Sequence, residues 1–175
     1  LVPIKGIDLL IQAMKDIPKC RLLVAGEGPE KARLVRLART VGITAQFLGY
    51  VTAAQRESIM RHADLFVQPS RMIHSRQEGC PVAVLEALDA GVPALMSATG
   101  GMREIAEKTG LMSIKPDQIS ALRNAIKRYL SDADFRQVQQ SIAQQQQNRW
   151  GWPTVIASHE TALLASYSRV EPPRE

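Results

Sequence analysis

Short apolar runs alternate with amphipathic segments along most of this chain. The runs are typical of strands that are buried on both faces, and they cover residues 21–25, 45–48, 65–68, 93–97 and 111–114. Between and after them, apolar residues recur every three or four positions, which predicts helices. These helices are expected at 7–14, 30–41, 53–62, 81–89, about 101–108, 117–130, 134–147 and 154–167.

Strands that alternate with helices are typical of βαβ units, which build parallel sheets through right-handed crossovers. We therefore predict an α/β fold of the Rossmann-like type, with a parallel sheet between two layers of helices. Ligands of such folds bind beyond the carboxyl ends of the strands. The loops at 26–29, 49–52, 69–80 and 98–101 all follow predicted strands, so we expect them to converge on one edge of the sheet.

The stretch from Pro69 to Gly91 carries the strongest signal for a binding site. A polar loop leads from a strand into an apolar helix that opens near Pro81 and carries an acid, Glu86, which we expect on the buried side of the helix. The free backbone N–H groups at such a helix start favour an anion. Arg71, His74 and Arg76 could contact an acceptor or the anion, but we interpret them as parts of a mobile polar loop.

Two glutamates, Glu78 and Glu86, flank this turn and stand eight positions apart. Eight helical residues rise about 12 Å, which exceeds the roughly 5–9.5 Å between the carboxylates of a hydrolytic pair. We therefore interpret each acid as holding a different part of one long ligand, with the N–H groups on its negative middle. A nucleotide-sugar, with hydroxyls at both ends and a diphosphate between them, has this layout.

Composition narrows the class of protein. A length of 175 residues suits one domain, which we place at 1–168 with helices from 116 to 168 and a disordered tail at 169–175. No apolar run approaches the about 18 residues that span a membrane.

The net charge of +5 suits an anionic substrate or membrane surface, but no basic block or aromatic–basic pattern indicates nucleic acid. Two isolated cysteines without metal spacing indicate reduced thiols in a cytoplasmic protein.

Six motifs, in unbroken order from residue 1 to about residue 168, resemble the family 4 retaining glycosyltransferases of the GT-B fold. The spacing Glu-x7-Glu followed by A-L-x-A-G-x-P is moderately specific, and the ordered set is specific. The motifs are Lys5-Gly6-Ile7-Asp8 with Gly26-Glu27-Gly28-Pro29, Phe47-Leu48-Gly49-Tyr50-Val51, Pro69-Ser70, Glu78-Gly79-Cys80-Pro81 running to Glu86-Ala87, Gly91-Val92-Pro93, and Gly100-Gly101.

The resemblance implies that the chain is the C-terminal, donor-binding half of a GT-B enzyme. Family members begin this half with a strand that ends in Gly-Arg-Leu shortly before Lys-Gly, and 1–4 resemble the residues that follow that arginine. We therefore expect the first strand, its phosphate-binding arginine and the N-terminal acceptor domain to be absent. The first strand is central in a Rossmann-like sheet, so a fragment without it would have a gap in its sheet. Either the sequence is truncated or the strands close up. Donor binding should persist without catalysis.

The resemblance also implies the residues that perform the reaction. Lys5 would pair with the diphosphate, and Glu78 would hydrogen-bond the hydroxyls of the transferred sugar. The N–H groups of Val82 and Ala83 would hold the phosphates, because Pro81 has no N–H. The family retains the anomeric configuration and needs neither a metal nor another cofactor.

The nucleoside end of the donor would be held by four further residues. Glu86 would bind the ribose hydroxyls, and Val51 and Thr52 would contact the base through their backbone groups. Gly26 would allow the donor to approach closely. A buried carboxylate needs a partner, and for Glu86 that partner could be a protein arginine, although we favour a ligand.

The interpretation is thus a UDP-sugar-dependent transferase of polysaccharide or lipid glycosylation, cytoplasmic and in peripheral contact with the inner membrane. UDP is inferred from its frequency in the family alone. A GT-B sugar epimerase or phosphorylase is one alternative, although no residue here indicates either reaction. A non-catalytic sugar-nucleotide sensor is the other, because the acceptor half is not in the sequence.

Overall fold

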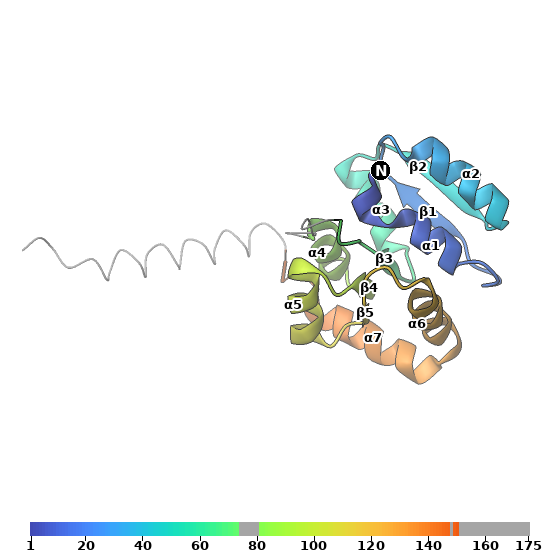
Figure 1. Cartoon of the computed structure of the whole chain (residues 1–175). Helices are drawn as coiled ribbons and strands as arrows, with labels where there is room; N and C mark the ends of the chain where they lie inside the picture. Colours follow the sequence, from blue (N-terminus) through green and yellow to red (C-terminus); the bar gives the residue numbers. More distant parts are fainter. Residues whose placement is uncertain (74–80, 148, 151–175) are drawn as a thin grey trace, which may run out of the picture.

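The computed structural model describes residues 1–73, 81–147 and 149–150 (Figure 1). Within them every expected helix and strand is present, and its ends lie within two residues of the expected ones. The expected helix at 154–167 and the tail at 169–175 lie outside the described residues. In chain order the elements are η1 (Pro3–Lys5), α1 (Ile7–Ala13), β1 (Leu22–Ala25), α2 (Lys31–Val41), β2 (Ala45–Gly49), α3 (Ala53–Arg61), β3 (Phe66–Gln68), α4 (Val82–Asp89), β4 (Ala94–Ser97), α5 (Gly100–Thr109), β5 (Ser113–Ile114), α6 (Ile119–Ser131) and α7 (Ala133–Gln146).

All strand pairs are parallel, as predicted, but the strands form two groups rather than one continuous sheet. One group has the order β1-β2 and the other has the order β3-β4-β5. Leu22 pairs with Ala45 in the first group, and Phe66 pairs with Ala94 in the second. No described strand of one group pairs with a strand of the other. The strands of the two groups therefore do not close up into one sheet, as expected of a sheet with a gap.

The strand β4 shows how the layers form, because all four of its residues are buried. Leu95 packs in an apolar cluster with side chains of α1 and α6. Its neighbours Ala94 and Met96 point to the opposite face and pack with side chains of α4, α5 and α7. Since side chains alternate between the faces of a strand, helices cover both faces here, which is the predicted three-layer arrangement.

The helix α1 joins the two groups of strands. Leu9 and Leu10 belong to the cluster that surrounds Leu95, whereas Ile11 packs against Leu34 of α2 beside the first group. Figure 1 shows α1 between α2 and α6, and the contacts agree. Burying a side chain such as that of Ile11, which is 0% exposed, contributes about 1.5–3 kcal/mol. A short helix that is apolar on most sides therefore bridges the gap in the sheet.

Two predicted helix ends are confirmed in detail. Gly42 follows α2 with a φ of +78°, the left-handed conformation in which glycine is favoured. Asp132 caps α7, where its side chain accepts a hydrogen bond of 2.9 Å from the backbone N–H of Phe135.

Tyr129 of α6 gives a test of this core. Its side chain is 1% exposed, and its hydroxyl donates a 2.7 Å hydrogen bond to the backbone carbonyl of Asp64. Burial, and then the nearby Asp64 carboxylate, raise the pKa of Tyr129. The Tyr129 hydroxyl therefore keeps its proton to a higher pH in the folded protein than in the unfolded chain. The contribution of Tyr129 to stability is complete below about pH 10 and is lost at higher pH.

We expect the Tyr129→Phe variant to lose about 1 kcal/mol of unfolding free energy at neutral pH, because one hydrogen bond is lost. Above about pH 10 its stability should decline less steeply than that of the unsubstituted chain. Urea denaturation followed by circular dichroism measures both. Tyr50→Phe is the control, since Tyr50 is 81% exposed. Equal alkaline slopes for Tyr129→Phe and the unsubstituted chain would show that Tyr129 does not carry this effect.

Candidate functional site

The predicted site residues that the structure describes lie at the carboxyl ends of the strands and at the helix starts that follow. Gly26 follows β1, Val51 and Thr52 follow β2, and α4 opens after β3. The loops are in direct contact, since the Gly26 N–H donates to the Gly49 carbonyl at 2.7 Å. The predicted convergence is therefore observed for the loops after β1 and β2. Glu78 lies outside the described residues.

Lys5 reaches this edge because η1 packs against the segment that follows β3. A Cβ atom placed on Gly6 would lie 2.0 Å from the Pro69 carbonyl oxygen, so only glycine fits there without movement. Gly6 also has a φ of +63°, which costs other residues energy. Next to it, the Arg71 N–H donates to the Ile4 carbonyl at 2.8 Å. These contacts fix the backbone on both sides of Lys5.

The start of α4 presents two backbone donors that no described residue uses. The N–H groups of Val84 and Leu85 donate to the Pro81 carbonyl, at 2.8 and 3.1 Å. Those of Val82 and Ala83 precede any intrahelical acceptor, and no described residue accepts from them. The Val82 side chain is 52% exposed. These donors and the helix dipole favour an anion.

Glu86 does not have the environment expected from the sequence. Its side chain is 33% exposed, and its Oε1 pairs with Nη2 of Arg56 in α3 at 2.7 Å. The expectation of a carboxylate on the buried side is thus wrong, because Val84, Ala87 and Leu88 form the buried face of α4. Of the two partners considered, the protein arginine is the one observed.

Thr52 has a structural role that the sequence analysis missed. It caps α3 in a reciprocal capping box, with Gln55 N–H donating to Thr52 Oγ1 at 3.2 Å and Thr52 N–H donating to Gln55 Oε1 at 2.9 Å. The signal was present as Thr-x-x-Gln before a helix. The Thr52 carbonyl also accepts from Arg56 N–H at 2.9 Å. The backbone of Thr52 is thus already hydrogen-bonded, while the neighbouring Val51 lies just outside the box.

A buried ion pair that the sequence analysis also missed holds the segment around Lys5. Asp8, whose side chain is 10% exposed, accepts from Nη2 of Arg71 at 2.8 Å, and Nε of Arg71 lies 3.2 Å from Asp117. Arg71 was interpreted as part of a mobile polar loop, and that interpretation is wrong. The signal was an acid inside an apolar helix, since Asp8 is flanked by Ile7 and Leu9. The pair ties α1, the loop after β3 and the start of α6 together.

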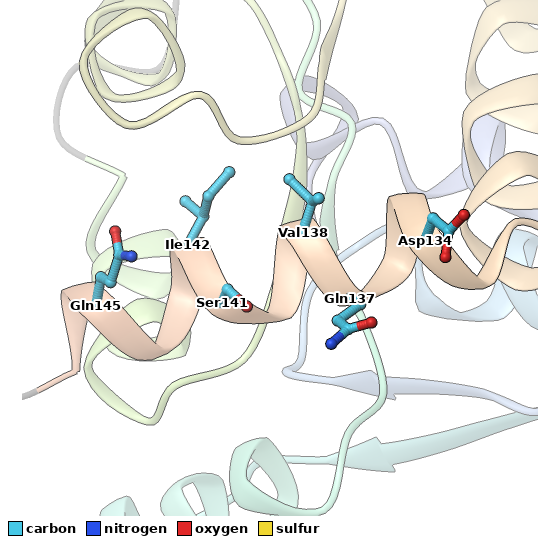
Figure 2. A pocket seen from close by; sticks show the side chains of 6 residues that line it. All are labelled: Asp134, Gln137, Val138, Ser141, Ile142 and Gln145. Carbon is cyan, nitrogen blue, oxygen red and sulfur yellow. The ribbon is translucent and has the colours of Figure 1, made fainter.

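A hollow of about 430 Å³ lies elsewhere, along α7. Its lining residues all project from this one helix and include one carboxylate but no cation, so it offers nothing to balance a diphosphate (Figure 2). They are Asp134, Gln137, Val138, Ser141, Ile142 and Gln145. A second hollow, of about 340 Å³, lies beyond β4 and β5 and contains Arg103 and Lys115.

Two further observations concern only the part of the chain that the structure describes. No group of three His, Cys, Asp or Glu side chains gathers there in a way that could hold a metal ion. No helix there is long and apolar enough to cross a membrane.

Comparisons with known proteins agree with this geometry. Residues 1–146 match the family model of the glycosyl transferases group 1. Over 97% of its length the chain is 29% identical to a GDP-mannose-dependent monoacylated alpha-(1-6)-phosphatidylinositol monomannoside mannosyltransferase of Corynebacterium glutamicum, and it covers 46% of that protein. Over 85% of its length it is 26% identical to the sulfoquinovosyl transferase SQD2 of Arabidopsis thaliana, and it covers 28% of that protein. The chain thus spans less than half the length of these curated relatives.

The fold is shared with solved structures. Anabaena Alr3699/HepE, crystallised in complex with UDP and glucose, superposes with a TM-score of 0.79 at 21% sequence identity. The match covers 97% of this chain and 46% of the HepE chain. At this level of identity the likeness establishes the fold alone.

The contact between Gly6 and Pro69 gives a prediction with a matched control. Gly6→Ala should lower the unfolding free energy by at least about 2 kcal/mol, because strain at positive φ adds to a backbone clash. Gly42→Ala should lower the unfolding free energy by the backbone strain alone, about 1 kcal/mol, since nothing lies within 4 Å of its Cβ position. Denaturant unfolding of both variants measures the difference. Equal losses would mean that η1 does not pack against Pro69.

Proposed function

The chain belongs to the glycosyl transferases group 1 family, and from that premise we propose that it is the donor-binding part of a transferase that uses a UDP-sugar. The observation that carries the proposal is the start of α4. Val82 and Ala83 present two N–H donors there from which no described residue accepts, and Glu86 lies one turn further along the same helix. An anion binder beside a carboxylate suits a ligand with a diphosphate and a ribose.

In this proposal the diphosphate lies on the amides of Val82 and Ala83, and Lys5 supplies a positive charge from η1. Preorganised donors of this kind stabilise the charge that develops on a leaving diphosphate, and they are worth most in a site that excludes water. Glu78 binds the hydroxyls of the transferred sugar. The transfer retains the anomeric configuration and uses no metal.

The nucleoside lies toward the loop after β2 in the same proposal. Glu86 accepts hydrogen bonds from the ribose hydroxyls, and Gly26 leaves room for the donor where the loops after β1 and β2 meet. Val51 contacts the base through its backbone. Thr52 joins it only through the remaining lone pair of its carbonyl, because its N–H is held in the capping box. The complexes of HepE with UDP support the choice of uridine, whereas the Corynebacterium relative is named for GDP-mannose.

The acceptor is proposed to bind a separate domain. Support comes from relatives more than twice as long as the region they share with this chain. One of them is named for a phosphatidylinositol-linked acceptor, and the net charge of +5 suits the surface of an anionic membrane. Peripheral contact with a membrane is therefore part of the proposal.

Titration calorimetry with UDP, GDP and ADP tests the proposal on the 175-residue chain. UDP should bind, and Glu86→Ala should weaken it by about 1–3 kcal/mol, the range for removing a partner of a polar group. Glu57→Ala is the control, because Glu57 is an exposed acid on α3 that pairs with Arg61, and it should leave the affinity unchanged.

The outcomes of this titration separate the parts of the proposal. Binding of none of the three nucleotides would contradict the donor-binding function. Tighter binding of GDP or ADP than of UDP would correct the base alone. Equal affinity of the Glu86→Ala variant and the unsubstituted chain for UDP would remove Glu86 from the site.

A further inference from the structure

We propose that Arg56 is a positioning residue that holds the Glu86 carboxylate ready for a ribose and so sets the preference for ribonucleotides. The inference rests on the proposed function, because it gives Arg56 a role toward the same donor. It comes from the 2.7 Å contact between Arg56 Nη2 and Glu86 Oε1, which joins α3 to α4.

Most other exposed ion pairs of the described helices join residues three or four positions apart in one stretch of chain, for example Arg61 with Glu57 at 2.9 Å and Lys108 with Glu104 at 2.6 Å. Exposed pairs of that kind add little to stability. Arg33 of α2 also lies 3.8 Å from Asp8 of α1, but that acid already pairs with Arg71 at 2.8 Å. The Arg56–Glu86 pair instead links two helices that both begin at the candidate site, so it can set the position of one relative to the other.

The backbone of Arg56 is held in place by a hydrogen bond near the start of α3. Its N–H donates to the carbonyl of Thr52 at 2.9 Å, directly behind the capping box that Thr52 and Gln55 form. The start of α3 is thus fixed to the loop after β2. The guanidinium therefore lies between the loop proposed to contact the base and the acid proposed to contact the ribose.

The pair leaves Glu86 able to bind a ligand. A carboxylate has two oxygens and about four lone-pair sites, and the 2.7 Å contact of Arg56 Nη2 is to Oε1. Oε2 can still accept hydrogen bonds from the 2′- and 3′-hydroxyls. Because the Glu86 side chain is 33% exposed, without Arg56 it would lose more rotamer freedom when it binds. Arg56 thus preorganises the acceptor.

Arg56 could instead compete with the ribose for Glu86. Whether removal of Arg56 weakens or tightens nucleotide binding distinguishes the two roles. If the pair had to break before ribose could bind, removing Arg56 would tighten nucleotide binding. The second oxygen of Glu86 makes breakage unnecessary, so we expect weaker binding instead.

The test compares UDP with 2′-deoxy-UDP on the 175-residue chain by titration calorimetry. The unsubstituted chain should prefer UDP. Arg56→Gln should weaken UDP binding about tenfold, as expected for loss of a charge-assisted contact, and should bring the ratio of the two affinities toward one. Arg56→Lys should recover part of both losses. A merely structural role would not change this ratio.

Two controls isolate the pair. Arg61→Gln removes an exposed arginine of the same helix and should change neither affinity nor ratio. The Arg56→Gln/Glu86→Gln double variant should bind UDP no more weakly than Glu86→Gln alone, because Arg56 acts through Glu86. Thermal melting of each variant verifies that it is folded, and Arg56→Lys supplies the comparison should Arg56→Gln unfold.

Failure of this inference can be told apart from failure of the proposed function. If the unsubstituted chain binds no UDP, the proposed function is wrong. If UDP binds and Glu86→Gln weakens it while Arg56→Gln matches the unsubstituted chain in affinity and ratio, the role of Arg56 is wrong and the function stands. Tighter binding by Arg56→Gln would likewise overturn the positioning role.

Discussion

The backbone amides at the start of α4 are the constraint on which the rest of the site depends. A helix cannot satisfy its own first N–H groups, and here the amides of Val82 and Ala83 have no acceptor among the described residues. The Arg56–Glu86 pair ties this helix to α3, which follows the loop after β2, and that loop meets the loop after β1. An anion at this helix start would therefore satisfy donors from which no described residue accepts.

The segment that carries Lys5 is held against this edge by packing and by charge together. Gly6 lets η1 lie directly on the Pro69 carbonyl, and Asp8 and Arg71 form a largely buried ion pair beside it. Breaking such a pair on one side is costly, because a buried charge is left without a partner. The same segment continues into α1, which bridges the two groups of strands. The fold and the candidate site thus share one anchoring region.

The sequence was sufficient for the elements of the fold and for the helix start, because both follow from local patterns. Apolar runs gave the strands, and Pro81 before an apolar helix gave the N–H donors. The gap in the sheet followed from the family resemblance. The partners of Glu86 and Arg71 could not be predicted, because Arg56 and Asp8 lie far away in the sequence and meet them only after folding. The capping role of Thr52 could have been predicted from the Thr-x-x-Gln pattern before a helix, but it was missed.

A nuclear magnetic resonance titration of the isotope-labelled chain with UDP tests the anion site most directly, since it reports on each backbone amide separately. The N–H signals of Val82 and Ala83 should shift most, with a smaller shift at Val51. If these signals stay in place while those along the hollow of α7, from Asp134 to Gln145, move instead, the diphosphate does not bind at the start of α4.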